Sequence, residues 1–255
     1  MILGLEFPPV SHAINWPGIF FEGTPFEVNK VVILMWLSVA LVFGFYMAAG
    51  RKQELVPRGL QNAAESAVEF IREGIIVQTM GQSGMGYAPF LLGMFSFIFV
   101  CNIWEIIPGA QMPVNARIAV PILMTAIVWV MYIVVGIKNQ GPIGYFKNSV
   151  FPPGVPKPLY VLVAPIELAT LLFVRPLSLS VRLFANMLAG HLLLISFAVL
   201  STALVAAKFW AVLAIATGGL LVGLVAFEIL VSFLQAYIFT ILTAVYIGDS
   251  QNPEH

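Results

Sequence analysis

Two arginines lie in an apolar run where a permanent charge needs a physical reason. The run extends from about 159 to 247, and the stretch VRPLSLSVRLFANMLAGH at 174–191 places Arg175 and Arg182 inside it. A guanidinium stays protonated at any accessible pH, and holding it at the middle of a bilayer costs roughly 2.5–3.5 kcal/mol on insertion scales. That cost falls when the charge faces a cavity or a partner, so we predict a functional role for Arg182.

Structural roles are the alternatives for the two arginines. Arg182 would then reach toward the lipid headgroups or pair with Glu167. Arg175 precedes Pro176, and we expect it to lie nearer a membrane interface than Arg182 does.

The polar residues of this region share helix faces. At about 100° per residue, Ser178, Arg182 and Asn186 form one stripe. Glu228 and Gln235 lie two turns apart on one face of the second half. If the two halves pair in antiparallel fashion, contacting residues have a nearly constant sum of residue numbers. This register places Arg182 opposite Gln235.

The same register places His191 opposite Glu228, which predicts an imidazole beside a carboxylate inside the membrane. With Glu167, these groups can exchange protons, because histidine titrates near pH ~6.5 and loss of water raises a carboxyl pKa toward neutrality. They would form steps of a proton path. The alternative is a packed His/Glu pair that only holds two helices together, with Asn186 and Gln235 as hydrogen-bonding residues between the helices.

No other motif indicates chemistry on a substrate. The sequence has no hydrolase triad, no phosphate-binding loop and no cluster of metal ligands, and Cys101 is its single cysteine. We therefore predict a non-catalytic protein with no cofactor and no bound metal.

Composition sets the class of protein. Of 255 residues, 60% are hydrophobic and 9% are charged, and the mean hydropathy is +0.96. Soluble domains have about 45–50% apolar and about 25% charged residues, so we predict an all-α polytopic membrane protein. The formal net charge of zero gives no basic surface for nucleic acid. The first residues lack a basic region before a short apolar core, so we expect no cleaved signal peptide.

The apolar runs predict about five membrane helices and one amphipathic helix on the cytoplasmic membrane surface, in a single membrane domain at 1–255. About 20 residues at 1.5 Å each cross a hydrocarbon core of ~30 Å. The predicted segments are an outer tail at 1–30, a span at 31–50, the amphipathic helix at 57–80 with Pro57 in its first turn, spans at 87–108 and 118–137, a Gly/Pro-rich cytoplasmic loop at 138–158, and a helical hairpin at 159–247.

The hairpin has one expected turn, at about 202–208. Each half is then roughly 60 Å of helix, twice the thickness of the bilayer core. We predict two long, steeply tilted helices. Four short spans are the alternative, although no strong loop signal divides 177–200 or 210–247.

Two polar residues lie near the end of the second span. Asn102 and Glu105 are three residues apart and would share a helix face if the helix continues to Pro108. They would either take part in a polar site or be ordinary interfacial residues.

The basic residues predict the orientation of the chain. Positive charge favours the cytoplasmic side, so the N-terminus is expected outside and the C-terminus in the cytoplasm. This topology puts seven Lys/Arg inside (51, 52, 58, 72, 138, 147, 157) and three outside (30, 117, 208).

Three motifs resemble one known family. SLSVRLFANMLAGH at 178–191, LQAYIFTILTAVY at 234–246 and NIWEIIP at 102–108 closely resemble subunit a of the F-type ATP synthase membrane sector, and the likeness covers essentially the whole chain in segment order. In that family the subunit is a stator whose two long helices, nearly parallel to the membrane, face a ring of c subunits. Two offset aqueous half-channels lead protons to and from the carboxylates of the ring.

The resemblance implies a role for each polar residue. Arg182 would be the essential stator arginine that prevents leakage between the half-channels. Glu105 would lie at the mouth of the outer half-channel, and Glu167 and Ser178 would lie nearer the inner one. The remaining residues of the arginine's surroundings and the outer half-channel would be Asn186, His191, Glu228 and Gln235, with Asn102 in the polar motif at the end of the earlier span.

One departure concerns positions 191 and 228. Some family members carry the acidic and imidazole residues there in the reverse order, so the pair rather than each residue would be the functional unit.

The resemblance also implies partners and a location. The partners would be the c-subunit ring, the peripheral-stalk b subunit, the rest of the complex and membrane lipid, with no nucleic acid. The location would be an energy-coupling membrane such as the bacterial inner membrane.

Two other functional classes stay open, a self-contained proton-coupled transporter and a purely structural membrane anchor. Reconstituting the chain alone tests the transporter class. A transporter should carry its solute without partners, whereas a stator half-channel should need the ring.

Overall fold

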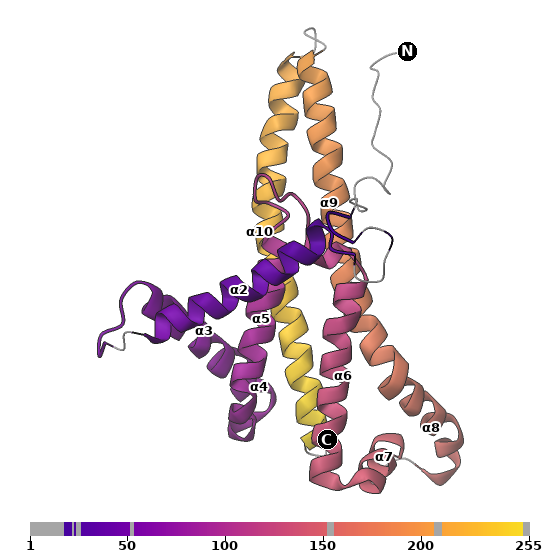
Figure 1. Ribbon diagram of the computed structural model, residues 1–255. Helices are drawn as coiled ribbons and strands as arrows, with labels where there is room; N and C mark the ends of the chain where they lie inside the picture. Colours follow the sequence, from indigo (N-terminus) through magenta and orange to yellow (C-terminus); the bar gives the residue numbers. More distant parts are fainter. Residues whose placement is uncertain are drawn as a thin grey trace. The chain divides into compact units, whose positions relative to one another are not determined.

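The computed structural model describes residues 18–21, 23, 27–51, 54–151, 156–206 and 211–251, and these form an all-α protein (Figure 1). Extended pairing in the described residues consists of one β-bridge, between Phe20 and Val28. The prediction of about five membrane helices, with the last two long, is confirmed. The stretches long and apolar enough to cross a membrane are Lys30–Gly50, Gly81–Ile103, Ala119–Gln140, Tyr160–Leu204 and Ile215–Gln251.

The described residues form two compact units. Both units draw residues from the early, middle and late parts of the chain. The first contains the described residues up to Val42, Phe97–Arg117 and Phe184–Gln235, and the second contains Phe43–Ser96, Ile118–Leu183 and the described residues from Ala236 onward.

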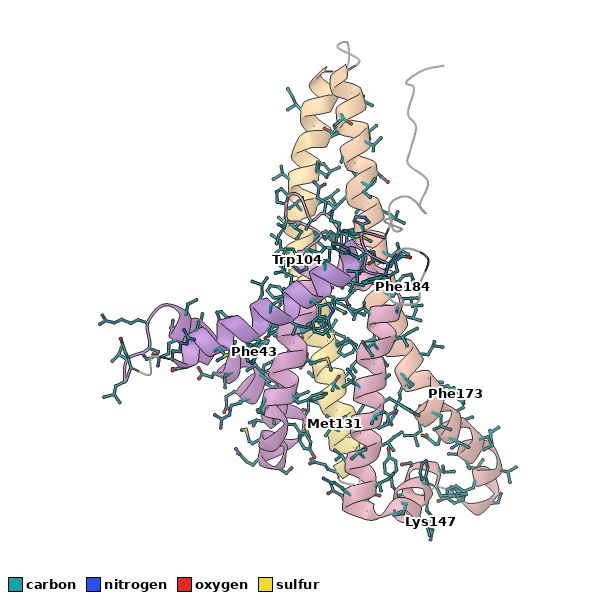
Figure 2. All side chains as sticks on the ribbon, viewed as in Figure 1. Phe43, Trp104, Met131, Lys147, Phe173 and Phe184 are labelled. Carbon is teal, nitrogen blue, oxygen red and sulfur yellow. The ribbon has the colours of Figure 1, made fainter. Side chains whose placement is uncertain are left out.

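Helix α2 (Lys30–Gly50) is apolar on all sides, which suits a membrane span. In the first unit, the indole nitrogen of Trp104 donates a hydrogen bond to Ser38 Oγ at 2.7 Å (Trp104 is labelled in Figure 2). The Ser38 hydroxyl in turn donates to the carbonyl of Leu34 at 2.8 Å. Both buried polar groups are therefore satisfied, and the segment around Trp104 is fixed against α2.

Helix α5 (Ala88–Ile103) ends at Ile103, although the sequence predicts that the span continues to Pro108. Asn102 lies in its last turn and Glu105 lies beyond it, so the prediction of one shared helix face is wrong. A tight turn replaces the helix, and the Glu105 amide donates to the Asn102 carbonyl at 3.2 Å. Pro108 has no amide hydrogen and disfavours a helical residue before it, so the helix ends ahead of it.

The amphipathic segment begins later than predicted. Helix α3 (Leu60–Ile71) continues through a π-helical turn (Arg72–Ile76) into α4 (Val77–Thr79). Gly59 has a φ of 58°, a left-handed conformation that glycine adopts without strain. The helix begins after this residue, so the prediction of Pro57 in the first turn is wrong.

Helix α6 (Ala119–Gln140) is followed by α7 (Pro142–Val150), which lies inside the segment predicted as a loop. Gly141 separates the two helices with a φ of 74°, and Pro142 takes the first helical position, where no amide hydrogen is needed. A methyl group on Gly136 would overlap the ring of Tyr145, so α7 packs closely on α6. The loop prediction is wrong here because Gly and Pro end one helix and begin the next.

The last part of the chain forms two long helices. Helix α8 (Tyr160–Ala169), a π-helical turn (Thr170–Val174) and α9 (Arg175–Ala206) are continuous, and α10 (Ala211–Gln251) follows. At 1.5 Å per residue α10 alone is about 60 Å long, so the alternative of four short spans is wrong. The expected turn falls on residues 207–210, which lie outside the described residues.

Candidate functional site

Five of the six predicted polar residues of the first unit are buried. A buried polar group needs a hydrogen-bond or ionic partner, or water, to offset its lost hydration. The exposed fractions are 0% for Asn102, 4% for Glu105, 6% for His191, 2% for Glu228 and 4% for Gln235, and Asn186 is half-buried.

His191 lies beside Glu105, at 3.6 Å between Nδ1 and Oε1, a distance at which the two groups form an ion pair when the imidazole is protonated and the carboxyl is ionised. The register predicted Glu228 opposite His191; in the described part of the chain the carboxylate within ion-pair distance of His191 is that of Glu105, and no ion pair joins His191 to Glu228. Glu105 comes from the turn after α5, a segment that a register between two helices does not include. Burial raises the pKa of Glu105 and the nearby imidazole lowers it, so the net upward shift keeps this carboxyl protonated to a higher pH than usual.

Glu228 instead lies against Gly190, the residue before His191. A Cβ atom at Gly190 would be 2.6 Å from both carboxylate oxygens of Glu228, which is closer than real contacts allow. The missing side chain of Gly190 therefore makes the space that the carboxylate occupies. Glu105 therefore lies beside His191, and Glu228 lies against the residue that precedes it on α9.

Asn186 and Gln235 make a second contact between α9 and α10. Asn186 Nδ2 donates to Gln235 Oε1 at 3.3 Å. This contact and that of Gly190 with Glu228 both fit antiparallel helices near the predicted register, and the later part of α9 and the earlier part of α10 run side by side in the first unit (Figure 1). The predicted pairing of Arg182 with Gln235 stays a prediction.

Asn115 is a buried polar residue that sequence reasoning missed. Its Nδ2 donates to Asn102 Oδ1 at 2.7 Å, and both residues have 0% exposure. Asn115 lies in a short 3-10 turn (Val114–Ala116), where a single asparagine between apolar residues gives no periodic signal. The bond connects this turn to the end of α5, next to Glu105.

A cavity of about 450 Å³ opens beside the His191 ion pair. Its polar lining includes Lys30, Glu105, Gln111 and His191, and leucine, isoleucine, valine and alanine side chains of α9 and α10 complete the wall. The ammonium group of Lys30 donates to the carbonyl of Gly109 at 3.1 Å. A cavity of this size with several polar groups has room for water.

Several buried polar atoms of the first unit also have unused hydrogen-bonding capacity. Such atoms need water to be stable in a folded protein. Together with the cavity they can support a chain of water molecules through which protons move. Among the described residues of the first unit, the buried side-chain atoms without a hydrogen-bond partner are Asn102 Nδ2, Glu105 Oε1 and Oε2, Asn115 Oδ1, Glu228 Oε2, Ser232 Oγ and Gln235 Nε2.

The second unit holds the other predicted residues. Arg182 and Ser178 are exposed on α9, and Glu167 is half-buried on α8. No ion pair joins Arg182 to Glu167 among the described residues of this unit, so the alternative in which Glu167 neutralises Arg182 is wrong. Arg175, by contrast, forms an ion pair with Asp249 at 3.6 Å. In the described parts of the chain, no group of three or more His, Cys, Asp or Glu is arranged to hold a metal ion.

Known proteins are similar in sequence to this chain over most of its length. A family model described as ATP synthase A chain matches residues 32–248. A protein of Frankia alni named ATP synthase subunit a is 40% identical over 250 residues, which are 97% of this chain and 86% of the relative. Proteins of the same name from Rhodococcus erythropolis (39% identical, 91% of this chain and 85% of the relative) and Hyphomonas neptunium (42% identical, 85% and 84%) are also similar.

Proposed function

Because the chain belongs to the ATP synthase A chain family, we propose that it is the proton-conducting stator subunit of an F-type ATP synthase. Two half-channels deliver protons to and from the carboxylates of a c-subunit ring, and proton flow turns the ring. The chain does not itself catalyse ATP synthesis. Its other partners are the peripheral-stalk b subunit, the rest of the complex and the surrounding lipid.

The observation that carries this proposal is the buried pair of Glu105 and His191 beside the cavity. A carboxyl such as Glu105, whose pKa is raised by burial, can bind and release protons closer to neutral pH. Glu228 adds a second buried carboxyl, which lies against Gly190, the residue before His191. These residues form the outer half-channel, with Asn102, Asn186 and Gln235 as its uncharged hydrogen-bonding groups.

Arg182 separates the two half-channels. Its guanidinium cannot lose a proton, so it holds a deprotonated ring carboxylate without relaying protons itself. The exposure of Arg182 on α9 supports this role, because a charge that serves a partner must be accessible. Each proton that crosses at 100 mV carries about 2.3 kcal/mol, so a leak past this point would waste the gradient.

The inner half-channel is assigned to the second unit. Ser178 and Glu167 line its path on the cytoplasmic side. The membrane is an energy-coupling one, such as the bacterial inner membrane, with the N-terminus outside and the C-terminus in the cytoplasm. The excess of Lys and Arg on the loops assigned to the cytoplasm supports this orientation.

Reconstitution tests the proposed function. The chain alone, the complete complex and the complex assembled without the chain are each placed in liposomes, and proton flux is driven by a potassium diffusion potential. We expect flux only from the complete complex, because each half-channel ends at the ring. Flux from the chain alone would favour a self-contained transporter, and equal flux without the chain would favour a structural anchor.

A further inference from the structure

A second arginine lies on the same face of α9 as Arg182. Seven residues of an α-helix return to within about 20° of the starting direction and advance about 10 Å. Arg175 therefore presents its side chain to the same side as Arg182, two turns earlier. Within 175–206 these are the two basic residues of α9. A mobile carboxylate passing this face would be attracted by both charges unless one of them is neutralised.

The structure shows that Arg175 is already engaged. Its guanidinium lies 3.6 Å from the carboxylate of Asp249, and its central carbon lies 5.1 Å from the ring centroid of Tyr246. A cation over an aromatic face is attracted by the negative charge density of the ring. Asp249 and Tyr246 are three residues apart on α10, so one face of that helix supplies both contacts.

The ring that receives Arg175 is held in place by its neighbours. Tyr246 and Tyr132 pack edge to face with their centroids 6.0 Å apart. The Tyr132 hydroxyl donates to the carbonyl of Leu171 at 2.8 Å, in the π-helical turn just before Arg175. The aromatic contact to Arg175 therefore comes from a ring that is itself held in place.

Arg182 differs in every one of these respects. It is exposed, and no ion pair engages it within the described residues of its own unit. On this face of α9, Arg175 is neutralised by a carboxylate of its own chain, whereas the charge of Arg182 is available to a partner.

We propose that Asp249 is a specificity-determining residue: it neutralises Arg175 so that Arg182 alone attracts a ring carboxylate. This inference rests on the proposed function of Arg182. Without Asp249, Arg175 competes for the carboxylate two turns away from the correct position and slows each step of the ring. The side chain of Asp249 is 48% exposed, so the ion pair is a modest one and the effect of its loss is limited.

The test uses the complete complex in inverted membrane vesicles that carry Asp249→Asn, Arg175→Gln or both changes. ATP-driven acidification is measured per amount of assembled complex. Asp249→Asn should slow pumping roughly two- to fivefold, which corresponds to the upper range for an exposed ion pair. Arg175→Gln should pump like the wild type, and the double variant should recover wild-type pumping, because the competing cation is gone.

These variants distinguish competition from a structural brace. If the pair only holds α9 against α10, Arg175→Gln will be as harmful as Asp249→Asn and the double variant will not recover, which overturns the proposal. Wild-type pumping by Asp249→Asn also overturns it. Asp249→Glu keeps the charge and should retain pumping. If Asp249→Asn fails to assemble, the pair has a structural role and the proposal is overturned, because competition for a ring carboxylate takes place only in the assembled complex.

An Arg182→Ala complex in the same vesicles separates this inference from the proposed function. Normal pumping by that variant would refute the function of Arg182 itself. Loss of pumping by Arg182→Ala together with normal pumping by Asp249→Asn would refute only the role of Asp249.

Discussion

The exposed arginine of the second unit and the buried carboxyl and imidazole groups of the first unit show two opposite ways to hold charge. Arg182 is accessible and is unpaired within its unit, whereas Glu105, His191 and Glu228 are enclosed and lie close to one another. A group with a permanent charge acts by attracting a partner, so burial within its own chain would disable it. A carboxyl that must gain and lose protons benefits from burial, because lost hydration raises its pKa, as it does for Glu105.

The largest expected effect comes from the accessible charge. Arg182→Ala should reduce ATP-driven proton pumping on the order of 10²-fold or more, as the removal of one electrostatic group from a reaction centre often does. Passive proton leak should rise, because no fixed charge then separates the half-channels. Arg182→Lys should also fail, since an ammonium lacks the planar fork and can lose its proton when desolvated.

The measurement is dye-reported acidification of inverted vesicles, followed by the decay of the gradient after ATP is exhausted. The amount of assembled complex serves as the control, because an exposed arginine contributes little packing. Normal pumping by either variant would mean that the exposed charge of Arg182 has no role in proton transport, and the contrast between the two units would then have no functional meaning.

A smaller effect is expected from the buried carboxyl. Glu105→Gln keeps the shape of the side chain but cannot bind or release a proton, so proton uptake should slow about tenfold to a hundredfold without a leak. Burial raises the pKa of Glu105, so the wild type should show an inflection in pumping rate above the usual carboxyl pKa of about 4.3. Glu105→Gln should lose this inflection. The same inflection in both proteins would assign it to another group.

The sequence predicted the arrangement of the buried residues Glu105, His191 and Glu228 only in part. Apolar runs and their lengths identified the spans, and the spacing of polar residues came close to the register of α9 and α10. The partner of His191 was missed because Glu105 lies in a turn outside both helices, and a periodic pattern carries no information about such a contact. The role of Gly190 was also missed, because the space left by an absent side chain depends on what packs against it.

The sequence also failed to predict where some helices begin and end. Gly and Pro between 138 and 158 indicated a loop, yet Gly141 and Pro142 end one helix and begin α7. The same residue types serve as loop formers and as helix boundaries, so composition alone does not separate the two.

Crowding Glu228 should have an intermediate effect. Gly190→Ala places a methyl group where the Glu228 carboxylate lies, and overpacking of this kind destabilises by about 1–3 kcal/mol. The carboxylate must shift away from its place against Gly190, so pumping should fall several-fold while passive leak stays low. Gly223→Ala on α10 is the matched control, because a Cβ there meets no atom within 4 Å. Equal losses in both variants would mean that helix flexibility, and not the position of Glu228, is responsible.

The smallest effect is expected at Ser232, which lies one turn from Glu228 on α10. Its hydroxyl is fully buried and has no hydrogen-bond partner, so it is placed to bind a water molecule in the outer path. Ser232→Ala removes that hydrogen bond with little change in volume and should slow pumping roughly two- to fivefold, which corresponds to about 0.5–1 kcal/mol, the lower part of the range for one hydrogen bond. Ser196→Ala is the control, because the Ser196 hydroxyl already donates to the carbonyl of Leu192 at 2.7 Å. If the two variants pump equally well, the buried polar atoms of the first unit do not form one continuous water path, and the contrast with Arg182 would then depend on Glu105, His191 and Glu228 alone.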